Sequence, residues 1–182
     1  MVDVSICSVA LVLIGDNSIQ HFADTTGGLT AKELWYPFKK NLLGEYPWPF
    51  SKKTERLNVL SEAPDEALGY SYKLQIPIDC IDILRVISGE RYDIYADGIY
   101  SNCNDVLLEF LADVEVNKFS THLEQAAIFG MAAMLAWAIP HEKAMSDSYQ
   151  EKYLSKLTQA KAKASQSRPS RGFTHSPFTD CR

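Results

Sequence analysis

Few residues in this sequence are placed where they could do covalent or acid–base chemistry. Cys103 and His122 could form a nucleophile and its general base, but nothing in the sequence brings the two together. A cysteine is more commonly a small buried hydrophobe. Glu62, Asp65 and Glu66 form an acidic cluster, which could supply a carboxylate pair for glycoside hydrolysis. A solvated loop is the simpler interpretation, so we expect no catalytic residue in this chain.

Metal-ligating and cofactor-binding patterns are also missing from the sequence. It contains no phosphate loop, dinucleotide fingerprint, His-Glu-x-x-His or Gly-x-Ser-x-Gly motif. The histidines and cysteines are scattered, without a Cys-x-x-Cys pair, which predicts reduced thiols in a cytoplasmic chain, no metal site and no cofactor. These residues are His21, His122, His141, His175, Cys7, Cys80, Cys103 and Cys181.

Length and composition are those of one soluble domain with a tail. Of the 182 residues, 46% are hydrophobic and 23% are charged, both ordinary values for a globular protein. The longest uninterrupted apolar run, Met131 to Ile139, is nine residues, whereas a membrane-spanning helix needs about 20. The first residues show no basic region or cleavage site, so we expect neither a signal peptide nor a membrane span.

Charge divides the chain into an acidic body and a basic end. Residues 1–149 hold 11 Lys/Arg and 21 Asp/Glu, a net charge of −10, whereas residues 150–182 carry a net +5. An acidic body argues against non-specific binding of nucleic acid by that body. The basic end remains available for an acidic partner.

Apolar periodicity predicts helices at both ends of the chain. Thr30 and Glu33 have capping-box spacing, and Pro37 lies inside the second helix, where a kink is expected. We interpret the Gly27-Gly28 pair as a turn before that helix. Ser120 or Thr121 can cap the third helix, which is rich in alanine and glycine. The predicted helices span residues 4–14, 30–44, 120–138 and 142–164.

The middle of the chain has the pattern of β-strands. Residues 70–76 alternate apolar and polar side chains, residues 81–87 are rich in β-branched types, and Asp97-Gly98 is a favoured two-residue hairpin turn. Residues 47–50 form an apolar plug in which Trp48 is expected to be buried. A small antiparallel β lobe over about residues 70–111 is therefore predicted.

The fold class that follows is mainly α (α+β): a helical bundle with an inserted small antiparallel β-sheet lobe and a flexible C-terminal tail. We predict one domain over residues 1–164 and an extended tail over residues 165–182. Ser, Pro, Gly and Arg dominate the tail, so it cannot build its own core. Its arginines can bind carboxylates bidentately, and its phenylalanines can anchor it on a partner; these residues are Arg168, Arg171, Phe173, Phe178 and Arg182.

Ordered segments over about residues 4–164 resemble the head-to-tail adaptor (connector) proteins of tailed bacteriophages, the tail tubular protein A-like group. Each segment alone is weakly specific, and their order is more so. They are residues 6–15 with Ile19, 42–50, 69–80 with 84–86, 95–102, the small-residue helix (Phe119, Leu123, Ala126, Ala127, Leu135 and Ala136) and the last helix (Tyr153, Leu157 and Ala160).

The resemblance implies a structural role. Such proteins form a homo-oligomeric ring, often twelve-fold, which joins the portal of the DNA-filled head to a tail or nozzle protein. DNA passes through the lumen without specific binding. The resemblance therefore implies a protein of the virion, at the head–tail interface, that is in the host cytoplasm during assembly. It carries over no catalytic residues, and it implies that the carboxyl-terminal extension docks into the portal.

Two other functions stay open at the level of sequence. One is a tail accessory enzyme such as a peptidoglycan hydrolase, for which the acidic cluster at Glu62 is the only support. The other is a tail-completion or minor capsid-binding protein that does not sit on the portal. We expect no membrane partner in any of these cases.

Overall fold

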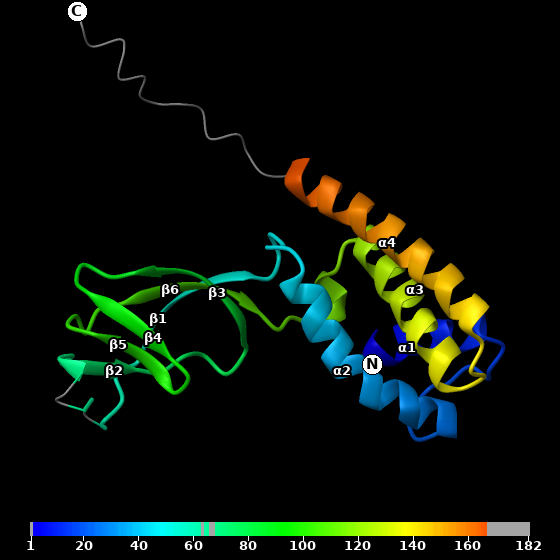
Figure 1. The fold of residues 1–182 in the computed structure, drawn as a ribbon, viewed down its shortest axis with the longest axis horizontal. Coiled ribbons are helices and arrows are strands. Elements are labelled where there is room, and N and C mark those ends of the chain that lie inside the picture. Colours follow the sequence, from blue (N-terminus) through cyan, green and yellow to red (C-terminus); the bar gives the residue numbers. More distant parts are fainter. Residues whose placement is uncertain (1, 63, 66–67, 167–182) are drawn as a thin grey trace, which may run out of the picture.

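The computed structural model describes residues 2–62, 64–65 and 68–166, which form a helical body joined to a β lobe (Figure 1). This arrangement confirms the predicted α+β fold class, with the lobe inserted between the second and third long helices. The helices that the structure describes are α1 (Val2–Leu13), α2 (Thr26–Gly44), the short 3-10 helix η2 (Val116–Lys118), α3 (Thr121–Ala138) and α4 (Lys143–Gln166).

Helix α3 is the centre of the helical body and packs against α1, α2 and α4. Its small residues allow this close approach. At Gly130, an added Cβ atom would lie 2.5 Å from Cζ of Phe38 on α2 and 3.0 Å from Cδ2 of Tyr153 on α4. Ala126 and Ala127 are fully buried, so the small-residue helix serves core packing.

Helix α2 begins four residues earlier than the capping-box spacing predicted. Thr25, not Thr30, is the N-cap: its Oγ1 accepts a hydrogen bond from Gly28 N at 2.9 Å. Thr30 Oγ1 instead donates to Thr26 O inside the helix. The Gly27-Gly28 pair is in the first helical turn, where a Cβ on Gly28 would lie 2.6 Å from the Phe22 carbonyl oxygen of the preceding loop. The prediction of a turn there was wrong.

The β lobe holds two antiparallel sheets in the part of the chain that the structure describes, where the sequence predicted one. One sheet has the order β1-β6-β3 and the other β2-β5-β4. Side chains of both sheets share one apolar core that contains Leu74, Ile99, Leu108 and Phe110. The strands are β1 (Lys52–Arg56), β2 (Tyr72–Leu74), β3 (Cys80–Ile87), β4 (Tyr92–Tyr95), β5 (Gly98–Ser101) and β6 (Leu107–Ala112).

Three strand details differ from the sequence prediction. Strand β1 was not predicted, because all five of its residues are exposed and charged or polar, so it has no apolar alternation to read. The alternating segment 70–76 forms only the short strand β2. In the β4–β5 hairpin, Tyr95 pairs with Gly98, which places the turn at Ala96-Asp97, one residue before the predicted position.

The apolar plug, residues 47–50, packs against the core of the helical body at the point where the chain passes from the body to the lobe. Trp48 is fully buried, as predicted, and its Nε1 donates a hydrogen bond to the Leu42 carbonyl oxygen at 3.0 Å. Its ring stacks on Phe50, with 6.1 Å between ring centroids. At the end of β6 the chain returns to the helical body beside this plug, where Ala112 N donates a hydrogen bond to Ser51 O.

Candidate interaction surfaces

The structure gives Cys103 and His122 no contact with each other. Cys103 lies in the loop after β5, where its Sγ donates to the Asp105 carbonyl oxygen, and it packs against the core of the lobe. His122 is in the first turn of α3, in the helical body. The structure therefore offers no support for a nucleophile–base pair.

The acidic residue Glu62 belongs to a charge cluster centred on Lys73 of β2. Lys73 Nζ lies 2.6 Å from Glu62 Oε2 and 2.9 Å from Asp97 Oδ2, and the lysine side chain is only 10% exposed. The hydrogen bonds that Lys73 donates to Glu62 and Asp97 raise the pKa of Lys73 above its ordinary value. The hydrogen bond from Lys73, followed by one from Tyr100, lowers the pKa of Asp97.

The Lys73 cluster does not suit Asp97 to the role of general acid in glycoside hydrolysis; its ionised form would suit only a nucleophile or general base. That reaction needs one carboxylic acid with a raised pKa, which protonates the leaving group. The shared ammonium group instead favours the ionised form of Asp97. The cluster is better explained as the link between the β4–β5 hairpin and the loop that precedes β2. Glu66, the third member of the predicted acidic cluster, lies outside the described residues.

Aromatic and charged side chains continue from Lys73 along the β2-β5-β4 sheet. The Tyr70 hydroxyl donates a hydrogen bond to Asp93, and this bond is the main reason that the pKa of Tyr70 is raised. Arg91 lies over the Tyr70 ring, 5.3 Å from its centroid. These contacts tie the edge strand β4 to the rest of the lobe.

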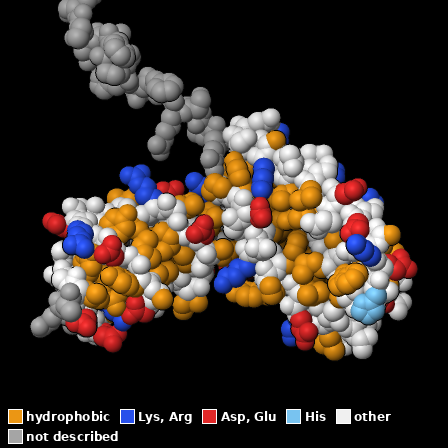
Figure 2. All heavy atoms as spheres, viewed as in Figure 1, with side chains coloured by type: hydrophobic (Ala, Val, Ile, Leu, Met, Phe, Trp, Pro, Cys, Tyr) orange, Lys and Arg blue, Asp and Glu red, His pale blue; other side chains and the backbone are white. Residues whose placement is uncertain are grey.

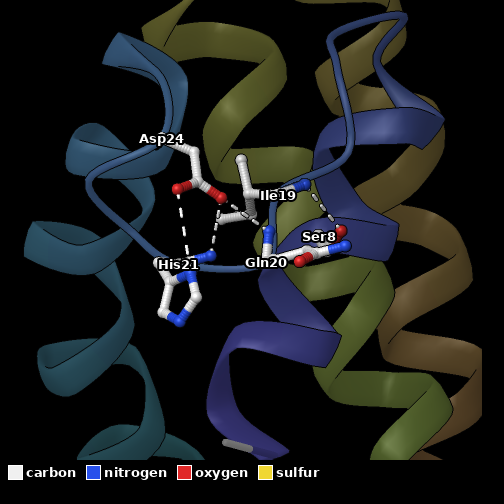
Figure 3. Close-up of polar contacts among 5 residues, drawn as sticks. All are labelled: Ser8, Ile19, Gln20, His21 and Asp24. Atoms are coloured by element: carbon white, nitrogen blue, oxygen red, sulfur yellow. Dashed lines mark hydrogen bonds and ion pairs between the residues drawn. The ribbon is translucent and has the colours of Figure 1, made fainter.

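Ser8 of α1 and the residues His21 and Asp24 of the loop between α1 and α2 lie near one another, but they do not form a catalytic triad (Figure 3). Asp24 Oδ2 accepts the backbone N–H groups of Gln20 and His21, which lower the pKa of the carboxyl group. Ser8 Oγ accepts the N–H of Ile19 at 3.0 Å. The His21 ring points away from Ser8 (Figure 3), and its side chain is 80% exposed. The group shapes the loop against α1.

Apolar side chains are exposed where the lobe meets the body. A cavity of about 420 Å³ opens between α2 and the loop before β3, and Tyr36 and Ile78 are among its lining residues. Ile78 is 97% exposed and Tyr36 is 56% exposed. Beside them Lys39 of α2 forms an ion pair with Asp113, at 2.7 Å between Nζ and Oδ1. This pair joins the two parts of the molecule.

The helical body carries a second apolar hollow, of about 400 Å³, over the carboxyl-terminal half of α3. Leu34 of α2, Met134 and Trp137 of α3 and Gln150 of α4 contribute to its lining. Trp137 is 57% exposed. On the face shown in Figure 2, hydrophobic side chains gather over the lobe and also over the helical body.

Neither a metal centre nor a membrane span emerges from the part of the chain that the structure describes. No group of three or more His, Cys, Asp or Glu side chains among those residues could hold a metal ion. No described helix is long and apolar enough to cross a bilayer. Burial, with a smaller contribution from Asp3, raises the pKa of the Cys7 thiol to about 12, so this cysteine is a packing residue and not a nucleophile.

The residues predicted to bind the portal lie outside the described residues: Arg168, Arg171, Phe173, Phe178 and Arg182. No model of a known protein family matches the sequence, and no curated protein matches it. The resemblance to phage adaptors therefore stays a prediction.

Sequence reasoning missed the Lys73 cluster, the Lys39–Asp113 pair and the hollow at Trp137. Lys73 and Asp97 are 24 positions apart in the sequence, and Lys39 and Asp113 are 74 positions apart. Sequence spacing therefore holds no signal for either ion pair. The third had a signal. Met134 and Trp137 lie four and seven positions after Gly130, on the same face of α3, and the residues of α4 that line the hollow beside them, Ser146, Asp147 and Gln150, are polar.

Proposed function

We propose that this protein is a structural adaptor that forms a ring between the portal of a phage head and the tail. The observation that carries the proposal is the exposure of large apolar side chains on both parts of the molecule, at Tyr36, Ile78 and Trp137. Tyr36 and Ile78 line one hollow and Trp137 lines another, and exposed apolar surface of this kind is typical of sites that bind another protein. A subunit in a ring has such sites on several sides, because it contacts its neighbours and the structures above and below.

The distribution of charge is compatible with passage of DNA through such a ring. Residues 1–149 carry a net charge of −10. Acidic walls would repel the phosphates of a duplex, so that it slides without being bound. On this proposal the protein is part of the virion, at the head–tail interface, and it is in the host cytoplasm during assembly.

The partners follow from the same proposal. Copies of this chain form the ring, expected to contain twelve; the portal protein lies on one side and a tail or nozzle protein on the other. The basic carboxyl-terminal segment with its phenylalanines would dock on the portal. Each copy would bind weakly because ordering a segment costs entropy, and many copies in a ring would restore the affinity through avidity.

Electron microscopy of the protein mixed with a candidate portal tests the proposal. We expect a second ring stacked coaxially on the portal. A variant that ends at Gln166 keeps α4 complete, and we expect it to fold with an unchanged melting temperature but to lose portal docking. Portal particles without a stacked ring, at saturating full-length protein, would contradict the proposal.

A zymogram with purified protein separates the adaptor from the peptidoglycan hydrolase. We expect no clearing of the cell-wall substrate. Copy number in virions then separates a ring adaptor from a minor tail-completion protein, since a ring requires many copies per particle.

A further inference from the structure

We propose that the hollow at Trp137 receives helix α1 of a second copy of this chain, so that copies associate head to tail. This inference rests on the proposed ring, for which it names the contact between neighbours. Two surfaces of the helical body carry it: the groove between α2 and α4, and an exposed stripe on α1.

The groove is the open end of the seam between α2 and α4. At Gly130 of α3, Phe38 and Tyr153 close this seam. Met134 and Trp137 follow on the same face of α3, because residues four and seven positions apart lie one above another on a helix. There the seam is open, with Leu34 on the α2 side and Gln150 on the α4 side.

Helix α1 has the exposed stripe. Ser5, Val9 and Val12 are all exposed and lie at positions i, i+4 and i+7, the spacing with which a helix places anchors in a groove. Val9 is 44% and Val12 is 53% exposed. Residues 4–15 contain no charged side chain, so the stripe itself brings no charge into the contact; Asp147 is the one charged residue among those that line the hollow.

The two surfaces face in opposite directions. Figure 3 shows α1 in front of α3, with α2 on one side and α4 on the other. The face of α3 opposite Trp137 carries Ala132 and Leu135, which are buried in the core of the body. The groove therefore opens on the side of α3 away from α1. A head-to-tail contact needs two different surfaces of this kind, whereas a two-fold dimer would use one surface twice.

The occupant is small, so a single contact should be weak. Three exposed side chains on one helix cannot bury the roughly 800 Å² per partner of a stable interface. We therefore expect the free protein to be monomeric in dilute solution. In a closed ring each copy would make two such contacts, and the combined affinity of all the contacts would hold the ring together.

Disulfide trapping of concentrated protein tests this contact. In a Cys181→Ser background, Val12→Cys and Trp137→Cys are prepared separately, and one of them carries a mass tag. After oxidation we expect the equal mixture to give a covalent dimer of the tagged and untagged chains, severalfold above background. The variant with both substitutions should give a ladder of multimers.

The matched control is Leu154→Cys on α4, which is also exposed, at 52%, and belongs to neither surface. Its mixture with Val12→Cys should stay at background. Met134→Cys provides a second probe of the groove if the tryptophan replacement alters folding. Dimers from Trp137→Cys alone, dimers from Val12→Cys alone, or a mixture no better than the control would each overturn the proposal.

The outcome is separable from that of the proposed function. If the protein forms stacked rings on the portal but the Val12→Cys and Trp137→Cys chains do not cross-link, the proposed contact is rejected and the adaptor proposal stands. A trapped ladder from a protein that never binds a portal would keep the contact and reject the adaptor.

Discussion

The helical body and the β lobe are held together by different interactions. The core of the body is almost entirely apolar, with Trp48, Leu42 and Leu123 fully buried. The lobe has a smaller apolar core, and its β2-β5-β4 sheet is fastened by charged side chains around Lys73 and Arg91. Apolar burial therefore dominates the stability of the body, while polar contacts contribute a larger share in the lobe.

Size explains this difference. Each three-stranded sheet of the lobe buries only the face that it turns to the other sheet, and the core that they share contains few residues. Apolar burial alone therefore contributes less free energy of folding there. Regions with fewer buried apolar contacts open locally at lower free energy. We therefore expect the lobe to exchange its amide hydrogens faster than α3 does.

The largest expected effect is in the body, at the plug. Trp48→Ala removes a fully buried ring and the hydrogen bond to the Leu42 carbonyl, and it should lower the free energy of unfolding by about 3–5 kcal/mol. Denaturant titration measures this loss. Trp137→Ala is the control, because that ring is 57% exposed, and it should leave stability nearly unchanged. Equal midpoints for both variants would show that the plug is not part of the core.

The junction between the two parts should come next. Lys39→Met leaves Asp113 without its cation and should lower the free energy of unfolding by about 2 kcal/mol, the range for hydrogen bonds to charged groups. The neighbouring Lys40→Met, at an exposed position, is the control. A double-mutant cycle with Asp113→Asn isolates the pair. Additive effects in that cycle would mean that the 2.7 Å ion pair does not couple body and lobe.

Close packing inside the body can be tested with a single methyl group. In Gly130→Ala the new Cβ would lie 2.5 Å from Phe38, and the overpacking should lower the free energy of unfolding by about 1–3 kcal/mol. Gly44→Ala is the matched control, since its Cβ would meet Ile81 at an ordinary 3.8 Å. We expect thermal melting to separate the two variants. A stabilised Gly130→Ala variant would show that the seam between α2 and α4 is looser than described.

The smallest effect belongs to the lobe and depends on pH. The pKa of Asp97 is lowered by Lys73, so its contribution is present above its unfolded-state pKa and is lost as the pH falls through the lower folded-state value. Asp97→Asn should therefore lower the melting temperature at neutral pH, and the difference from the parent protein should shrink towards pH 3. The effect is small because the Asp97 side chain is 55% exposed. Asp82→Asn, an exposed substitution on β3 outside the Lys73 cluster, is the control.

The candidate surfaces were only partly accessible to sequence reasoning. The burial of Trp48 was predicted from its place between two prolines, and the structure confirms it. The exposure of Trp137 was not predicted, because an apolar face on a helix is read as core. Whether another element covers that face depends on where α2 and α4 diverge, which is a property of their packing.

The sequence by itself determined the fold class, the four long helices to within a few residues of their ends and the existence of an antiparallel lobe, because periodicity and turn chemistry act over neighbouring residues. Only the tertiary structure decided what depends on distant segments. Strand β1 pairs with β6 although none of its side chains is buried. Helix α2 starts at Thr26, capped by Thr25, and the preceding loop at Phe22 comes so close that Gly28 has no room for a side chain. Lys73 finds Glu62 and Asp97 across the lobe. In each case the deciding contact joins residues whose separation in sequence carries no periodic signal.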